Sequence, residues 1–427
     1  MKTKKILQSI LAASLVSSSA LCVFAPTNFF TPYDPNLRLP ECPKTRFQVG
    51  ANIEWGQTHH CKNWDGDKKN VLQIYNDYED VALMFKHPSD ENREAVVAAY
   101  NDLYSAFGGQ LTTAPVKFTG EFSQLDATIF GKYTFRDFIK GNLGIYLFLP
   151  VRNAEISDLS FKDESSDYLP VVPEYFKQNY TQSFDTFKNK IKSLGGPDLQ
   201  NWNKTGLGDA VIMLDWTRSF HQSKEVLKNV DLSIKLGLSM PTAEKKNIDN
   251  AFSMPLGNDG AWGIPLGAGL GLDFEHHIRL GGDVEFVVFL NETHIRRLKT
   301  DYNQTEILLL NKGNATVDYG LTWKFNLFLQ AYRVWKGLSF KVAYEYIKHD
   351  SDKLSEKTDT FNYDIINSAN SLKEWNTHNL IFQLNLDFFK WVEFVAKPQM
   401  SLFYKLPLTG KNVINSQNIG GQIGFNF

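Results

Sequence analysis

The sequence predicts an all-β protein, a transmembrane antiparallel β-barrel of about 12 strands (range 10–14), with amphipathic helices in the first two long external loops. Three observations support this fold class. From residue 205 onward, apolar residues occupy every second position in successive runs, and a period of two indicates β-strands. The runs span about 11–17 residues, whereas soluble strands have roughly 5–6 and roughly 9–11 suffice to cross a bilayer. The connections between runs alternate between short and long, as in outer-membrane barrels.

Composition excludes several other classes of protein. Among the 427 residues, 45 Lys+Arg and 47 Asp+Glu give a net charge of −2, which leaves no basic excess for nucleic-acid binding. With 43% hydrophobic and 14% aromatic residues, the chain is not disordered. The mean hydropathy is −0.30, and no window after residue 25 holds the roughly 18 apolar residues of a spanning helix. A helical membrane protein is therefore excluded.

The N-terminus has the pattern of a secretory signal over residues 1–25. Three lysines precede an apolar stretch from Ile6 to Val16, and small residues follow it, so cleavage is expected after Ala20 or Ala25. We expect residues 26–44 to form a periplasmic N-terminal segment. Residues 45–427 then form the outer-membrane barrel, in which 58–115 and 152–205 are long, partly helical loops.

Cys42 and Cys61, which both follow the predicted signal of residues 1–25, leave two interpretations open. An exported protein meets an oxidising environment, which favours a disulfide. A spanning strand over 45–57 would instead hold the two residues roughly 43 Å apart. A disulfide needs Cα atoms within about 7 Å. The cysteines are therefore either bonded, without this strand, or unpaired, with it.

The predicted strands share alternation of apolar with polar residues or glycine. They lie near 45–57, 116–135, 141–151, 206–220, 229–240, 261–274, 277–290, 317–332, 337–348, 377–388, 391–404 and 415–427. In the fifth of these strands, for example, Val230, Leu232 and Ile234 alternate with polar Asp231 and Ser233. An even strand count returns both termini to the periplasm.

The polar faces of these strands predict a wet lumen. Its expected charged lining is Glu54, Asp215, Asp231, Lys235, Asp273, Arg279, Asp283, Glu285, Lys324, Lys341, Glu345, Asp387, Glu393 and Lys397. These nine acids and five bases are consistent with a polar path of mild cation preference, or with a salt-bridge network that closes a narrow barrel.

Helical spacing of apolar residues appears in the first two long loops. One helix is expected from Ser89 or Asp90 to Gly108, and a second within 173–196. Their apolar faces consist of Val96, Tyr100, Leu103, Phe107, Phe176, Tyr180, Phe184 and Phe187. These faces either pack the helices together as a cap or also line an apolar capture site.

No pattern predicts an enzyme, a cofactor or a metal site. His221 and Ser223 have the spacing of the outer-membrane phospholipase A pair, but they fall in a predicted turn. His59, His60, Cys61, Asp65 and Asp67 match no metal-ligand spacing and indicate a solvated loop.

The last strand ends in Ile423, Phe425 and Phe427 on one face. This end resembles the C-terminal signal that barrel-insertion machinery recognises in Gram-negative outer-membrane proteins. The expected partners are this machinery, outer-membrane lipid and small-molecule solutes, with no nucleic acid.

Three segments resemble a known transporter family. They are GLGDAVIML (206–214), LGLSMPTAE (236–244) and GIPLGAGLGLDF (263–274). They look like the outer-membrane transporters of the long-chain fatty-acid channel family and its relatives associated with phenol degradation. The resemblance implies passive uptake of small, often hydrophobic molecules, helical external loops and an N-terminal hatch in the pore. The chain departs from this family in having twelve rather than fourteen predicted strands and no Asn-Pro-Ala start.

The predicted function is a passive channel or transporter for small solutes, including hydrophobic ones, in the outer membrane of a Gram-negative-type bacterium. The alternatives are a plugged structural or adhesive barrel, a soluble exported β-protein and a barrel hydrolase.

Overall fold

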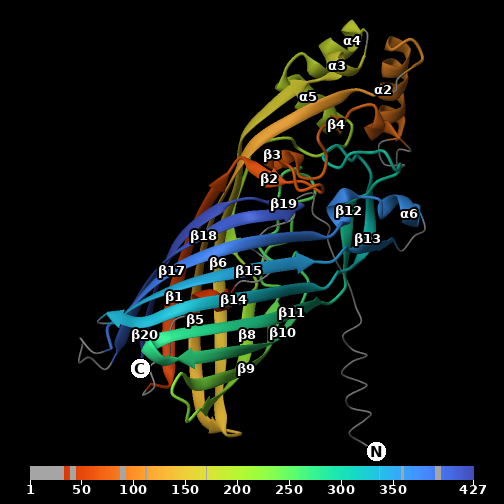
Figure 1. Ribbon diagram of the computed structural model, residues 1–427. Coiled ribbons are helices and arrows are strands. Elements are labelled where there is room, and N and C mark those ends of the chain that lie inside the picture. The colour runs from red at the N-terminus through yellow and green to blue at the C-terminus, as the bar shows by residue number, and fades with distance from the viewer. Residues whose placement is uncertain are drawn as a thin grey trace, which may run out of the picture.

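The structure confirms the predicted fold class. The computed structural model describes residues 33–38, 45–86, 93–110, 113–169, 171–335, 337–356, 360–389 and 396–427. In this part of the chain twelve antiparallel strands form a closed barrel (Figure 1). The predicted signal, residues 1–25, lies outside the described residues.

The barrel strands follow the predicted ranges closely. They are β1 (Phe47–Thr58), β5 (Pro115–Phe138), β6 (Gly141–Asp163), β8 (Ala210–His221), β9 (Leu227–Met240), β10 (Gly263–Phe274), β11 (Ile278–Phe289), β14 (Thr322–Trp335), β15 (Leu338–His349), β17 (Trp375–Asp387), β18 (Lys397–Lys411) and β20 (Gln417–Asn426). Each strand pairs with the next, and β20 pairs with β1 in a register that sets Ala51 opposite Ile423. Phe427 N–H also donates to the Phe47 carbonyl at 2.8 Å, so the C-terminus completes the wall.

The wall exposes its apolar side chains and buries its polar ones. On β18, Leu402 is 66% exposed, whereas the adjacent Ser401 is 4% exposed. On β1, Ile53 is 52% exposed and Glu54 is 7% exposed. This inverted pattern is that of a barrel whose outer surface meets lipid and whose lumen is polar. No helix among the described residues is long and apolar enough to span a membrane.

The two ends of the barrel differ. Figure 1 shows the β5–β6 hairpin extending beyond the other strands at the end that carries the helices, which we call the loop end. There β4 (Glu79–Asp80) pairs with β5, and β7 (Trp202–Leu207) pairs with β6. Two small sheets lie among the loops: β12 (Glu292–Arg297), β13 (Lys312–Asp318) and β16 (Lys353–Glu356), and β19 (Val413–Ile414), β2 (His60–Lys62) and β3 (Lys68–Asn70). The opposite end, with short connections, is the turn end.

The first predicted loop helix is present as α2 (Arg93–Ala106), and Gly108 follows it with a φ of +63°. That left-handed conformation favours glycine and ends the helix. The second helix is not continuous, which corrects the sequence expectation. It consists of α4 (Glu174–Phe176), the π-helix η5 (Lys177–Thr181) and α5 (Phe184–Ser193). The break arises because Ser183 is extended and its side chain accepts the Thr186 N–H, which starts a new helix.

The remaining short helices lie in the connections and before β1. They are η1 (Pro35–Leu37), η2 (Val71–Gln73), η3 (Leu83–Phe85), α3 (Ser165–Tyr168), η6 (Glu275–His277), α6 (Tyr363–Ile366) and η7 (Asn370–Leu372).

The apolar faces of the loop helices lie in one buried cluster. Val96, Leu103, Phe176, Tyr180 and Phe187 are all buried, and Tyr100, Phe107 and Phe184 pack against them. The Phe107 and Phe176 rings are 5.7 Å apart, and the Phe184 and Phe161 rings stack at 5.7 Å. Each buried aromatic side chain contributes about 1.5–3 kcal/mol through removal from water. The helices therefore pack as a cap over the loop end of β5 and β6.

Cys61 lies on β2, beyond the loop end of β1, and is fully buried. Its thiol donates to the Asn70 carbonyl at 3.0 Å. The strand that the unpaired interpretation requires is present as β1, whereas Cys42 lies outside the described residues.

Candidate functional site

The lumen contains a segment of the chain itself, residues 33–38, which we call the N-terminal segment. Asp34 caps η1 by accepting the Asn36 N–H at 2.8 Å. Residues 26–44 are predicted from the sequence to lie in the periplasm, but the structure places residues 33–38 inside the barrel. The physical reason is that several of these side chains have a specific partner on the wall, and a strand pattern cannot reveal such partners.

One set of contacts joins this segment to β6, β8 and β11. Tyr33 Oη donates to Glu285 Oε1 at 2.8 Å, and its ring lies 5.2 Å from the Phe148 ring. Arg38 Nη1 donates to Asp215 Oδ2 at 2.5 Å. The Arg38 guanidinium also lies 4.8 Å from the centre of the Tyr146 ring, which adds a cation–π contact.

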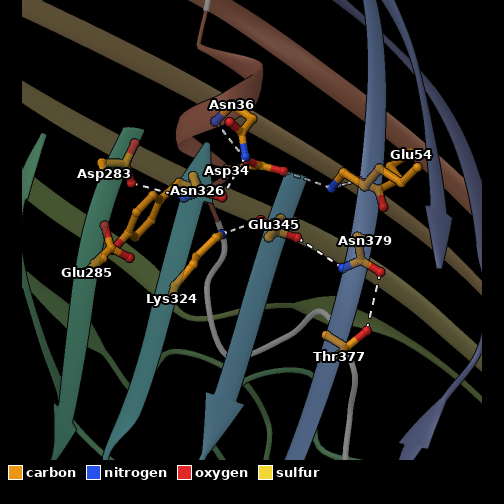
Figure 2. Close-up of polar contacts among 12 residues, drawn as sticks. Asp34, Asn36, Glu54, Asp283, Glu285, Lys324, Asn326, Glu345, Thr377 and Asn379 are labelled. Atoms are coloured by element: carbon orange, nitrogen blue, oxygen red, sulfur yellow. Dashed lines mark hydrogen bonds and ion pairs between the residues drawn. The ribbon is translucent and has the colours of Figure 1, made fainter. Parts of the chain in front are cut away.

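A second set of contacts joins the segment to β14, β15 and β18, as Figure 2 shows in part. Asn36 Nδ2 donates to Asn326 Oδ1 at 2.7 Å, and Lys341 Nζ donates to the Asn36 carbonyl at 2.6 Å. Lys405 Nζ lies 3.2 Å from Asp34 Oδ2 and 2.8 Å from Glu54 Oε2. The segment is thus held from opposite sides by charges of opposite sign.

Apolar packing completes the closure. Leu37 is 2% exposed and lies in a cluster with Ala343, Ile381 and Phe403, which project from β15, β17 and β18. The segment therefore crosses the lumen rather than lying along one strand. Within the described part of the chain it pairs with no strand, and the contacts that hold it are those of side chains and single carbonyl groups.

Thirteen of the fourteen predicted lumen residues lie in the described part of the chain, and twelve of these make the following polar contacts. Glu54, Asp215, Glu285 and Lys341 contact the N-terminal segment or its partners, as given above. The others form pairs along the wall: Lys324 with Glu345 at 3.0 Å, Lys235 with Asp283 at 3.5 Å, Arg279 with Asp231 at 2.6 Å and with Asp273 at 3.4 Å, and Asp387 with Arg333 at 2.9 Å. Lys397 begins β18, and Glu393 lies outside the described residues.

Some inward charges, such as Lys405 and Arg152, are absent from the predicted lumen lining. Lys405 was missed because the predicted strand ends at 404, whereas β18 continues to Lys411. The sequence does contain a pattern that places Lys405 in the lumen, because this residue continues the inward odd-numbered series of Gln399 and Ser401. Arg152, which is fully buried and donates to Asp126 at 3.0 Å, lies just after a stretch of β6 that is apolar on both faces.

A small cavity of about 30 Å³ lies between the N-terminal segment and the wall. Its lining is aromatic and polar: Tyr33, Asp34, Leu37, Arg38, Gln48, Asn52, Thr128, Phe130, Tyr146, Phe148 and Gln422. Aromatic faces with a few convergent polar groups are typical of sites for small amphipathic molecules.

Residues of the segments GLGDAVIML (206–214) and LGLSMPTAE (236–244) join two loops at the loop end of the wall. Asp209 is fully buried, and its carboxylate accepts the Ala243 N–H at 3.0 Å and the Asn258 N–H at 2.5 Å. Thr242 Oγ1 donates to the Gly208 carbonyl at 2.7 Å and accepts the Ala210 N–H at 2.9 Å. The Gly-Asp and Pro-Thr motifs thus bind each other and anchor the loop over residues 241–260.

The other candidates from the sequence are not assembled into a reactive site. His221 Nδ1, at the exposed end of β8, lies 3.3 Å from Asn229 Oδ1 on β9. His59 Nε2 lies 3.5 Å from Glu121 in a solvated loop. At the C-terminus, Ile423 and Phe427 are exposed on the outer face.

Comparisons with known proteins show the fold. No protein-family model matches the chain, and no curated protein matches it. A solved outer membrane channel from Pseudomonas putida F1 is similar, with a TM-score of 0.52 and 11% identity over 92% of this chain and 100% of that chain. A FadL homologue from Pseudomonas aeruginosa has a TM-score of 0.28 and 8% identity, over 90% of this chain and 89% of that chain. A mutant of the TodX monoaromatic hydrocarbon channel has a TM-score of 0.34 and 10% identity, over 90% and 91%. The first likeness shows that the two chains share the barrel fold.

Proposed function

We propose that the protein is a passive outer-membrane channel for small solutes, including hydrophobic ones, and that the N-terminal segment closes its lumen. The observation that carries the proposal is the way this segment is held. Its contacts are ion pairs, single hydrogen bonds and one apolar side chain, without strand pairing in the described part of the chain. Contacts of this kind can break without unfolding the barrel, because the wall has its own complete set of strand pairs.

The aromatic pocket and the shared fold also support this function. The pocket offers Phe130, Tyr146 and Phe148 to an apolar group beside polar Asn52 and Gln422. Outer-membrane location, insertion through the strand that ends in Ile423, Phe425 and Phe427, and membership of the fatty-acid channel family belong to this proposal. They rest on the outward apolar belt and on the motifs described above.

A structural or adhesive barrel with a permanent plug is the second candidate. It is favoured by buried ion pairs along the inner face of the wall, such as Lys324 on β14 with Glu345 on neighbouring β15, in which both side chains are almost inaccessible to solvent. The two candidates differ in their permeability to solute. A passive channel must pass solute when the contacts of the N-terminal segment are weakened, whereas a permanently plugged barrel does not.

Swelling of liposomes in a pentose solution tests this difference. We expect Arg38→Gln to increase the swelling rate about tenfold over the unmodified protein, because the change removes the ion pair with Asp215. A charge-assisted bond contributes about 1.5–3 kcal/mol, and about 1.4 kcal/mol shifts an equilibrium tenfold. Arg136→Gln is the matched control, since Arg136 is exposed and donates only to the Thr45 carbonyl among the described groups. No swelling with either variant supports the permanent plug.

A further inference from the structure

We propose that the lumen contains a binding site for the carboxylate of a small monocarboxylate solute, and that Asp34 occupies this site as an intramolecular competitor. This inference rests on the proposed channel function and names the class of solute. It differs from the sequence expectation of a mild cation preference.

The Asp34 carboxylate is surrounded by cationic groups from three strands. Lys405 Nζ on β18 lies 3.2 Å from Asp34 Oδ2. The charges of Lys324 on β14 and Lys341 on β15 also act on this carboxylate. Figure 2 shows Asp34 on the segment facing the strands that carry Glu54 and Glu345. A carboxylate at this point therefore receives favourable interactions from three lysines at once.

The three lysines differ in the polar partners that they keep when the N-terminal segment, with Asp34, moves out of the lumen. Lys324 keeps Glu345, and Lys405 keeps Glu54. Lys341 donates to the Asn36 carbonyl, which belongs to the segment itself. Departure of the segment thus removes both this carbonyl and the Asp34 charge from Lys341. Lys341 Nζ then keeps its cation–π contact with the Phe328 ring at 4.6 Å but has lost a neighbouring negative charge, so the empty site favours another carboxylate.

The apolar part of such a solute can occupy the space that Tyr33 and Leu37 leave when the segment departs. Asp34 and Leu37 line the pocket together with Phe130, Tyr146 and Phe148. A molecule with a carboxylate at one end and a small apolar ring at the other can therefore place the two groups in adjacent environments. Its carboxylate competes with Asp34 for Lys405 and Lys341, and its binding weakens the hold of the segment.

Counting the charges along the lumen does not reveal this site. The wall acids that outnumber the bases in sequence are largely neutralised by neighbours, as in the pairs of Asp283 with Lys235 and Asp231 with Arg279. The cationic groups near Asp34 are grouped because β14, β15 and β18 lie on the same side of the barrel, with only β17 between the last two.

Calorimetric titration of the refolded, full-length protein with benzoate and with neutral benzamide tests the proposal. We expect benzoate to bind at least tenfold more tightly than benzamide. Asp34→Asn should tighten benzoate binding about tenfold by removing the competitor, and Lys341→Gln should weaken it at least tenfold. Lys204→Gln is the control, because Lys204 lies on β7 and pairs with Glu244 outside the lumen. Heat-modifiable migration on gels verifies that each variant is folded.

The possible results separate this inference from the channel function. Equal affinity for benzoate and benzamide, or no binding of either, contradicts the carboxylate site. Benzoate binding that Asp34→Asn does not tighten contradicts the competitor role. Either result leaves the swelling assay intact as the test of a channel, so failure of the site and failure of the channel are distinguishable.

Discussion

Replacing residues 33–38 by a Gly-Ser linker of equal length is expected to raise the single-channel conductance in planar bilayers by at least about tenfold. The linker keeps the chain length but removes the contacts of Arg38, Asp34 and Leu37 with the wall. Loss of several contacts of about 1–3 kcal/mol each is sufficient for a shift of this size. The wall pairs are unaffected, so the barrel should still fold.

A matched replacement of residues 221–226, the last residue of β8 and the turn between β8 and β9, controls for the linker itself. This variant should conduct like the unmodified protein. If the replacement of residues 33–38 leaves the conductance at the unmodified level, the segment does not determine closure, and the account of the lumen fails.

The second large effect concerns stability rather than transport. Asp209→Ala should lower the free energy of unfolding by about 3–4 kcal/mol, because two buried backbone N–H groups, of Ala243 and Asn258, lose their acceptor. The loop that they anchor carries Phe252 and Met254 into the buried cluster at the loop end. We therefore also expect faster proteolysis between residues 241 and 260.

Guanidinium-induced unfolding in detergent measures this change. Asp318→Ala, at an exposed position at the end of β13, should stay within about 0.5 kcal/mol of the unmodified protein. Asp209→Asn should lie between the two, since an amide oxygen can accept one of the bonds. An Asp209→Ala variant as stable as the control contradicts the anchoring role.

The barrel could be predicted because the alternation of apolar and polar residues is visible within each strand and repeats from strand to strand. Every strand must present apolar groups to lipid and polar groups to the lumen, so each run reports its own orientation, as Leu402 and Ser401 do on β18. The prediction was weakest where this contrast is absent, as in β6, whose residues 143–151 are largely apolar on both faces. The break of the second loop helix was missed because the apolar stripe continues through it, although Ser183 is a recognisable helix cap.

The lumen contents could not be predicted in the same way. Residues 33–38 have no period, and their partners Asp215, Lys341 and Lys405 are distributed over more than 190 positions of the chain. Which charges neutralise one another depends on strand order and register, which a list of inward residues does not contain. The resemblance to a transporter family implied an N-terminal hatch, but no residue pattern before β1 identified the segment.

The most direct test of the central claim is a disulfide between the N-terminal segment and the wall. Leu37 and Ala343 belong to one buried cluster. Leu37→Cys combined with Ala343→Cys, in a chain with Cys22, Cys42 and Cys61 replaced by Ala, should form a cross-link under oxidation. The cross-linked protein should lose solute-induced liposome swelling, and reduction should restore it. Failure to cross-link, or unchanged swelling after complete cross-linking, would contradict closure of the lumen by residues 33–38.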